Sequence, residues 1–102
     1  MIQFEWDEAK AKANEKKHGV SFEDSIHIFE DPYVLSEQDR IEDGEQRWQS
    51  IGLVGGIVLL LVAHTIQSSK EEQDEVVRII SARRADRKER IRYDENRAKN
   101  SF

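Results

Sequence analysis

The stretch that decides the fold is Val76-Val77-Arg78-Ile79-Ile80-Ser81-Ala82-Arg83-Arg84-Ala85-Asp86-Arg87-Lys88-Glu89-Arg90. Its first half, Val76 to Ala82, is short, apolar and rich in Val and Ile, which predicts a buried strand. Asp86 is a good helix N-cap residue, and Glu89, three residues later, can complete a capping box by accepting a hydrogen bond from the Asp86 N–H. The stretch therefore predicts a strand that leads directly into a basic helix.

Basic residues gather where this strand is expected to end. Arg83 and Arg84 stand at its exit, and the helix that follows, roughly Arg87 to Ala98, is rich in Arg and Lys. Guanidinium groups hold phosphate oxygens through pairs of parallel hydrogen bonds, so a polyanion would bind well at this point.

Charge is divided unequally along the chain, although the net charge is −5. Residues 76–102 carry nine Lys and Arg against four acids, whereas residues 21–75 carry 13 acids against three Lys and Arg. This division suggests one surface for phosphates and another for something basic. A solvated charged helix without a ligand explains the same pattern, and charge alone leaves both interpretations open.

Two strand-like runs, 46–54 and 57–66, flank Gly55-Gly56, which is the pattern of a two-residue hairpin. If Val54 pairs with Ile57, the register places Arg47 directly opposite His64 on one face of the hairpin. The second run is apolar from residue 57 to residue 63, so we expect a central strand that is covered on both faces.

The N-terminal third predicts an edge strand and two helices. Phe4 to Trp6 is the candidate edge strand, and Asp7 can cap a helix that runs to about Lys17. Ser21 begins a second helix, which ends at Asp31-Pro32 because proline disfavours the helical conformation in the residue before it. The predicted class is therefore α+β, with two N-terminal helices, an antiparallel sheet of three or four strands and a C-terminal helix.

The totals limit the class of protein. A chain of 102 residues predicts a single domain, residues 1–102, and the lack of cysteine excludes disulfides and thiol chemistry. No apolar run reaches the length of a membrane helix, and the N-terminus lacks a signal pattern, so we expect a soluble cytoplasmic protein. No His, Asp and Glu cluster has metal-ligand spacing, which predicts catalysis, if any, without a metal or other cofactor.

RNA cleavage is a reaction that such a chain could perform, because RNA supplies its own nucleophile, the 2′-hydroxyl. Arg83 ranks first as a phosphate-binding residue at the strand end, and Arg47 and His64 follow because the predicted register brings them together. Glu45 is an alternative base near the start of the hairpin. The further residues expected to contact RNA are Arg84, Trp48, Lys17, His18, Arg87 and Tyr93.

Several of these residues also have purely structural interpretations. A lone histidine such as His64 is commonly a hydrogen-bonded structural residue, and Trp48 is commonly part of a core. Arg84 can pair with an acid of residues 21–75, and Glu45 can be a solvated surface residue.

The block Ile79-Ile80-Ser81-Ala82-Arg83-Arg84-Ala85 with Arg87-Lys88-Glu89-Arg90 resembles the BrnT toxins of bacterial type II toxin–antitoxin pairs. Further blocks similar to that family follow its order along the chain: Phe4-Glu5-Trp6-Asp7-Glu8-Ala9-Lys10, Asn14, Lys17-His18-Gly19-Val20-Ser21-Phe22 and Glu45-Gln46-Arg47-Trp48. The resemblance implies a small ribonuclease that blocks translation and is distantly similar in fold to the RelE toxins. It also implies a BrnA-like antitoxin with a ribbon-helix-helix domain, a heterotetramer of the two, and contact with operator DNA only through the antitoxin.

Two functions from different classes follow. The first is a metal-independent endoribonuclease toxin. The second is a non-catalytic module that binds protein or RNA, such as a toxin homologue that has lost its activity. Cleavage of RNA by the purified chain discriminates between them.

Overall fold

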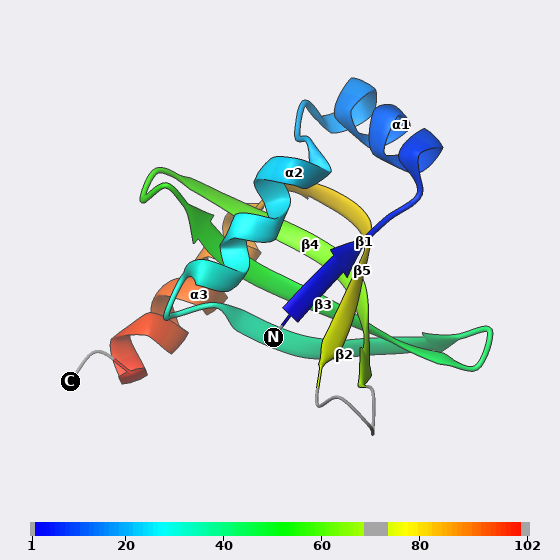
Figure 1. Cartoon of the computed structure of the whole chain (residues 1–102). Coiled ribbons are helices and arrows are strands. Elements are labelled where there is room, and N and C mark those ends of the chain that lie inside the picture. The colour runs from blue at the N-terminus through cyan, green and yellow to red at the C-terminus, as the bar shows by residue number, and fades with distance from the viewer. Residues whose placement is uncertain (1, 69–73, 101–102) are drawn as a thin grey trace.

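The computed structural model describes residues 2–68 and 74–100, which form three α-helices, a 3-10 helix and five strands (Figure 1). The elements in chain order are β1 (Ile2–Glu5), α1 (Glu8–His18), α2 (Phe22–Ser25), the 3-10 helix η1 (Ile26–Glu30), β2 (Leu35–Glu42), β3 (Glu45–Val54), β4 (Val58–Ser68), β5 (Glu75–Arg84) and α3 (Arg87–Asn100).

One sheet carries all five strands in the order β1-β5-β4-β3-β2. The α+β class is confirmed, but the sheet is larger than the predicted three or four strands and is mixed. β1 pairs with β5 in parallel, while the other neighbours are antiparallel. The strand predicted at Phe4 to Trp6 exists as β1, at an edge of the sheet and ending at Glu5. β4 is central, as its uninterrupted apolar sequence predicted.

The predicted helix ends are confirmed because they depend on local hydrogen bonds. Asp7 caps α1 by accepting from the Lys10 N–H at 3.1 Å, and the Ser21 hydroxyl accepts from the Asp24 N–H at 3.1 Å. At α3 the full capping box is present: Asp86 Oδ1 accepts from the Glu89 N–H at 2.9 Å, and Glu89 Oε1 accepts from the Asp86 N–H at 2.8 Å.

The sheet separates two hydrophobic clusters. Figure 1 shows α2 in front of the sheet and α3 behind it. The helix-covered cluster under α1, α2 and η1 includes Phe22 and Ile28, both fully buried. Ile28 lies against Gly52 of β3, where an added Cβ would be 2.7 Å from the Ile28 Cβ. On the opposite side, Tyr93 of α3 packs on Ile51 and its neighbours.

The hairpin between β3 and β4 has a register one residue away from the predicted one. Val54 pairs with Val58, and the turn contains a third residue, Ile57, whose N–H donates to the Val54 carbonyl at 3.1 Å. Both turn glycines adopt positive φ, 61° at Gly55 and 71° at Gly56. Side chains alternate between the two faces of a strand. A shift of one residue therefore gives each β3 residue a different partner on β4 from the predicted one, and Arg47 no longer lies opposite His64.

Candidate nucleic-acid interface

A polar area on the α3 side of the sheet collects most of the predicted catalytic residues. Along β3, alternation puts Glu45, Arg47 and Gln49 on the same side as Ile51, which packs beneath α3. Across the sheet, Gln49 pairs with Ala63, which pairs with Ser81, and Leu61 pairs with Arg83. Thr65 pairs with Arg78 on the same side. We call this set the arginine face: Glu45, Arg47, Gln49, Thr65, Arg78, Ser81 and Arg83.

Arg83 is already engaged by a carboxylate. Its Nη1 donates to Glu89 Oε1 at 2.8 Å and its Nη2 donates to Glu89 Oε2 at 2.9 Å. The hydrogen bonds that Arg83 donates to Glu89 raise the pKa of Arg83 above its ordinary value. Burial alone would raise the pKa of Glu89, but the bonds from Arg83 and from the Asp86 N–H outweigh it, so that pKa is lowered. Both groups are therefore charged at neutral pH.

A second ion pair crosses the arginine face between β3 and β5. Glu45 accepts from the Arg78 guanidinium, and the Gln67 amide also donates to Glu45 at 3.4 Å. The side chain of Glu45 is 29% exposed, so its carboxylate can be reached from solvent. Sequence reasoning missed Arg78, because it treated Val76 to Ala82 only as a buried strand.

Arg47 differs from the other two arginines because a donor of its guanidinium is buried without an acceptor in the part of the chain that the structure describes. Its Nε is buried and has no hydrogen-bond partner among the described residues. A buried donor left without an acceptor costs free energy, so such groups often mark the position of a ligand or water.

His64 is not part of the arginine face, so the expectation that it lies opposite Arg47 is wrong. Trp48 occupies the position across from His64. His64 is fully buried in the helix-covered cluster, with its ring edge-on to Phe29 at a centroid distance of 5.2 Å. Nδ1 faces the Thr65 carbonyl at 3.3 Å and Nε2 faces the Ser50 hydroxyl at 2.7 Å. Burial lowers the pKa of His64, which favours a neutral ring with a structural role.

The residues predicted to contact RNA do not converge on one surface. Lys17 and His18 are exposed at the end of α1, and Arg84 lines a small cavity of about 180 Å³ that includes Gly19 of the same region. Arg84 pairs with Leu60 and so points to the opposite side from Arg83. Trp48, half-buried, shares the side of His64, and Arg87 is exposed on α3.

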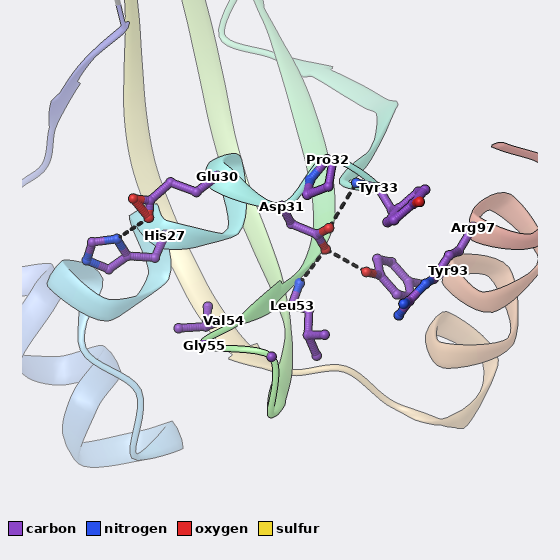
Figure 2. A pocket seen from close by; sticks show the side chains of 11 residues that line it. His27, Glu30, Asp31, Pro32, Tyr33, Leu53, Val54, Gly55, Tyr93 and Arg97 are labelled. Carbon is purple, nitrogen blue, oxygen red and sulfur yellow. Dashed lines mark hydrogen bonds and ion pairs between the residues drawn. The ribbon is translucent and has the colours of Figure 1, made fainter. Parts of the chain in front are cut away.

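A cleft of about 600 Å³ lies away from the arginine face, at the other end of α3 (Figure 2). Asp31 accepts three hydrogen bonds there, from the Tyr33 N–H at 2.8 Å, the Leu53 N–H at 2.8 Å and the Tyr93 hydroxyl at 2.6 Å. Tyr93, predicted to stack on RNA, is only 2% exposed. Arg97 lies over the Tyr33 ring, 5.1 Å from its centre. This cleft is best explained as a structural junction.

Electrostatics at that junction follow from the hydrogen bonds. Burial alone would raise the pKa of Asp31, but the bonds from Tyr93, Leu53 and Tyr33 lower it below its ordinary value. Burial, together with the bond to Asp31, raises the pKa of Tyr93 to about 12. Sequence reasoning used Asp31 only as a helix end. Its role as a hydrogen-bond acceptor could have been found from its place before a turn, because an aspartate there commonly accepts from the N–H two positions later.

Within 2–68 and 74–100, no three His, Cys, Asp or Glu side chains are grouped so that they could hold a metal ion. In the same residues, no helix has the length and apolar character needed to cross a membrane.

Comparison with known proteins gives a family match over most of the chain. The family model described as "Ribonuclease toxin, BrnT, of type II toxin-antitoxin system" matches residues 6–89. The crystal structure of the Brucella abortus ribonuclease toxin, BrnT, superposes with a TM-score of 0.59 at 22% sequence identity, covering 85% of this chain and 100% of that one. At this identity the likeness concerns the fold. No curated protein matches the sequence.

Proposed function

The chain belongs to the BrnT ribonuclease toxin family of type II toxin–antitoxin systems, and from that premise we propose that it cleaves RNA endonucleolytically at the arginine face and thereby inhibits translation. The observation that carries the proposal is the buried Nε of Arg47, which has no hydrogen-bond partner within residues 2–68 and 74–100. It lies on the same side of β3 as Glu45, two residues away, or roughly 7 Å along a strand. A phosphodiester oxygen would satisfy this donor.

The residues of the arginine face suit each part of the reaction. Glu45 accepts the proton of the 2′-hydroxyl, the 2′-oxygen forms a bond to phosphorus, and the bond from phosphorus to the 5′-oxygen breaks. The leaving 5′-oxygen takes up a proton from water, so the products are a cyclic phosphate and a 5′-hydroxyl. Arg47 and Arg78 stabilise the negative charge on the phosphoryl oxygens, and we propose that this makes a metal ion unnecessary. His64 has no place in the scheme because it is buried on the other side.

The family implies a cognate antitoxin. We propose that it is BrnA-like, with a ribbon-helix-helix domain, that toxin and antitoxin form a heterotetramer in the cytoplasm, and that operator DNA is contacted only through the antitoxin. The acidic β2–β3 hairpin, with Glu42, Asp43 and Glu45, supports docking of a basic segment. Charge reversal at these three positions should weaken antitoxin binding, and unchanged affinity would refute this placement.

Cleavage assays with matched arginine variants test the proposal. Wild-type protein should cut RNA equally well with and without excess EDTA, whereas Arg47→Ala should lose about 10²- to 10³-fold in rate. Arg40→Ala is the matched control, because Arg40 is an exposed β2 residue paired with Glu42. Circular dichroism verifies that both variants are folded. Equal rates for Arg47→Ala and wild type would exclude the arginine face as the site.

A second candidate function has one specific observation in its favour. Two cations of the arginine face, Arg78 and Arg83, are already neutralised by Glu45 and Glu89. This pairing suits a non-catalytic module that binds RNA or protein. The outcome that would support it is tight RNA binding without cleavage and no growth arrest when the well-expressed chain is induced in cells.

A further inference from the structure

The ion pair of Arg83 uses only part of its guanidinium. Nη1 donates to Glu89 Oε1 and also to the Arg84 carbonyl at 3.2 Å, while Nη2 gives one of its two N–H groups to Glu89 Oε2. Glu89 thus holds the end of the group formed by the two terminal nitrogens. The Nε–H and the second Nη2–H lie along a different edge of the plane.

That second edge has no acceptor among residues 2–68 and 74–100. The side chain of Arg83 is 38% exposed, whereas that of Glu89 is 8% exposed. The held end of the guanidinium therefore faces a buried carboxylate, while the Arg83 side chain as a whole keeps more than a third of its surface exposed. Two parallel N–H groups on one edge match the spacing of two oxygens of a phosphate.

Glu89 is itself fixed by the start of α3. Its Oε1 also accepts from the Asp86 N–H, and its own N–H donates to the Asp86 carboxylate. The capping box thereby joins the guanidinium of β5 to the first turn of the helix. An arginine on a flexible stem would otherwise adopt several orientations, of which only some would align the phosphodiester for cleavage.

We infer that Glu89 is a positioning residue, which fixes Arg83 so that its Nε–Nη2 edge binds a phosphodiester of the RNA next to the cleavage site. The inference rests on the proposed ribonuclease function and deepens it. In this arrangement Arg83 contacts the substrate and Glu89 acts only through Arg83.

If Glu89 positions Arg83, replacing Glu89 should affect RNA binding and cleavage differently from the loss of a purely structural residue. Removing the charge of Glu89 leaves Arg83 positive but loosely held. RNA binding should then become tighter and more salt-dependent, while cleavage becomes slower. A capping residue without a role in positioning would change stability alone, or would change both measurements in the same direction.

The test uses Glu89→Gln, Arg83→Ala and the double variant in the full-length protein. Glutamine can still accept the capping-box hydrogen bond, so the fold should be kept, and thermal unfolding checks this. Binding is measured by anisotropy with a single-stranded RNA whose 2′-hydroxyls are methylated, over a range of salt concentrations. Cleavage is measured in single turnover at saturating protein with the unmodified RNA. Glu30→Gln is the matched control, an exposed acid paired with His27 on the other side of the sheet.

Glu89→Gln should slow cleavage about 10- to 100-fold at saturation and steepen the slope of log affinity against log salt by about 0.7. Arg83→Ala should weaken binding at least about tenfold, and the double variant should cleave no more slowly than Arg83→Ala. The inference would be overturned if Glu89→Gln cleaved RNA at the wild-type rate. It would also be overturned if the rate losses of the two single variants multiplied in the double variant. Unchanged binding by Arg83→Ala would overturn it too. If the wild type cuts no RNA, the proposed function fails, and binding alone then decides whether Glu89 positions Arg83 on phosphate.

Discussion

Replacing Tyr93 with phenylalanine removes one hydroxyl from the junction between α3 and the rest of the molecule. That hydroxyl donates to Asp31 Oδ2 at 2.6 Å and joins residues that are 62 positions apart in the chain. The ring can remain in place against Ile51 and its neighbours. The variant therefore isolates one hydrogen bond to a carboxylate from the packing that surrounds it.

The size of the effect follows from what Asp31 retains. A hydrogen bond to a charged group contributes about 1.5–3 kcal/mol. Asp31 keeps its bonds from the N–H groups of Tyr33 and Leu53, so the lower end applies. We expect a loss of about 1.5 kcal/mol, which for a domain of this size lowers Tm by about 6–12 °C.

The loss should also depend on pH, with a defined sign. The pKa of Asp31 is lower in the folded protein than in the unfolded chain, where it is about 3.9. Its contribution to stability is therefore present above about pH 4 and is lost as the pH falls through the lowered pKa of the folded state. Since Tyr93 contributes to this lowering, the difference between Tyr93→Phe and wild type should shrink in acid.

Urea unfolding monitored by circular dichroism, at neutral pH and at about pH 2, measures the free energy of unfolding and so tests both the loss of stability and its decrease in acid. Tyr33→Phe is the matched control, because the Tyr33 hydroxyl has no hydrogen-bond partner among the described residues while its ring lines the same cleft. A destabilisation of Tyr93→Phe that equals that of Tyr33→Phe, or one that is the same at both pH values, would refute this reasoning.

Three further substitutions test the packing and the caps, each by urea unfolding. Gly52→Ala should destabilise by about 1–3 kcal/mol, because the new Cβ would lie 2.7 Å from the Ile28 Cβ and 2.8 Å from its carbonyl oxygen; a neutral effect would mean that η1 shifts freely. Asn14→Ala should cost about 2–3 kcal/mol, since the buried amide bonds both the N–H and the carbonyl of Ala82, at 3.1 and 2.8 Å. Asp86→Ala should cost about 1 kcal/mol through loss of the α3 cap, and an unchanged midpoint would show that α3 starts without it.

Local signals in the sequence predicted much of the architecture. The Asp86–Glu89 capping box, the Asp7 cap and the helix end before Pro32 appear where the sequence placed them. Each depends on hydrogen bonds or steric limits within a few residues, which the local sequence contains in full. The family resemblance rested on blocks spread over the chain, and the family match over residues 6–89 confirms it.

Prediction was weaker where the helix changed its geometry. The interval of an α-helix marks Phe22, Ile26 and Phe29 as core-facing residues. Phe22 is fully buried and the other two pack partly buried against the same cluster, but Ile28, which lies outside that set, is also fully buried. From Ile26 the segment is a 3-10 helix, whose tighter turn rotates successive side chains further around the axis.

The sequence by itself determined most of the elements, their order and the family. Only the tertiary structure decided which side chains meet. One additional turn residue, Ile57, moved His64 away from Arg47 and into the core, because a strand has a period of two and any odd shift exchanges its faces. Arg83 pairs with Glu89, and Tyr93 bonds to Asp31, because the elements that carry them pack together in a way that no local pattern specifies. The basic run therefore predicted a phosphate site, while the fold determined which edge of one guanidinium remains available for it.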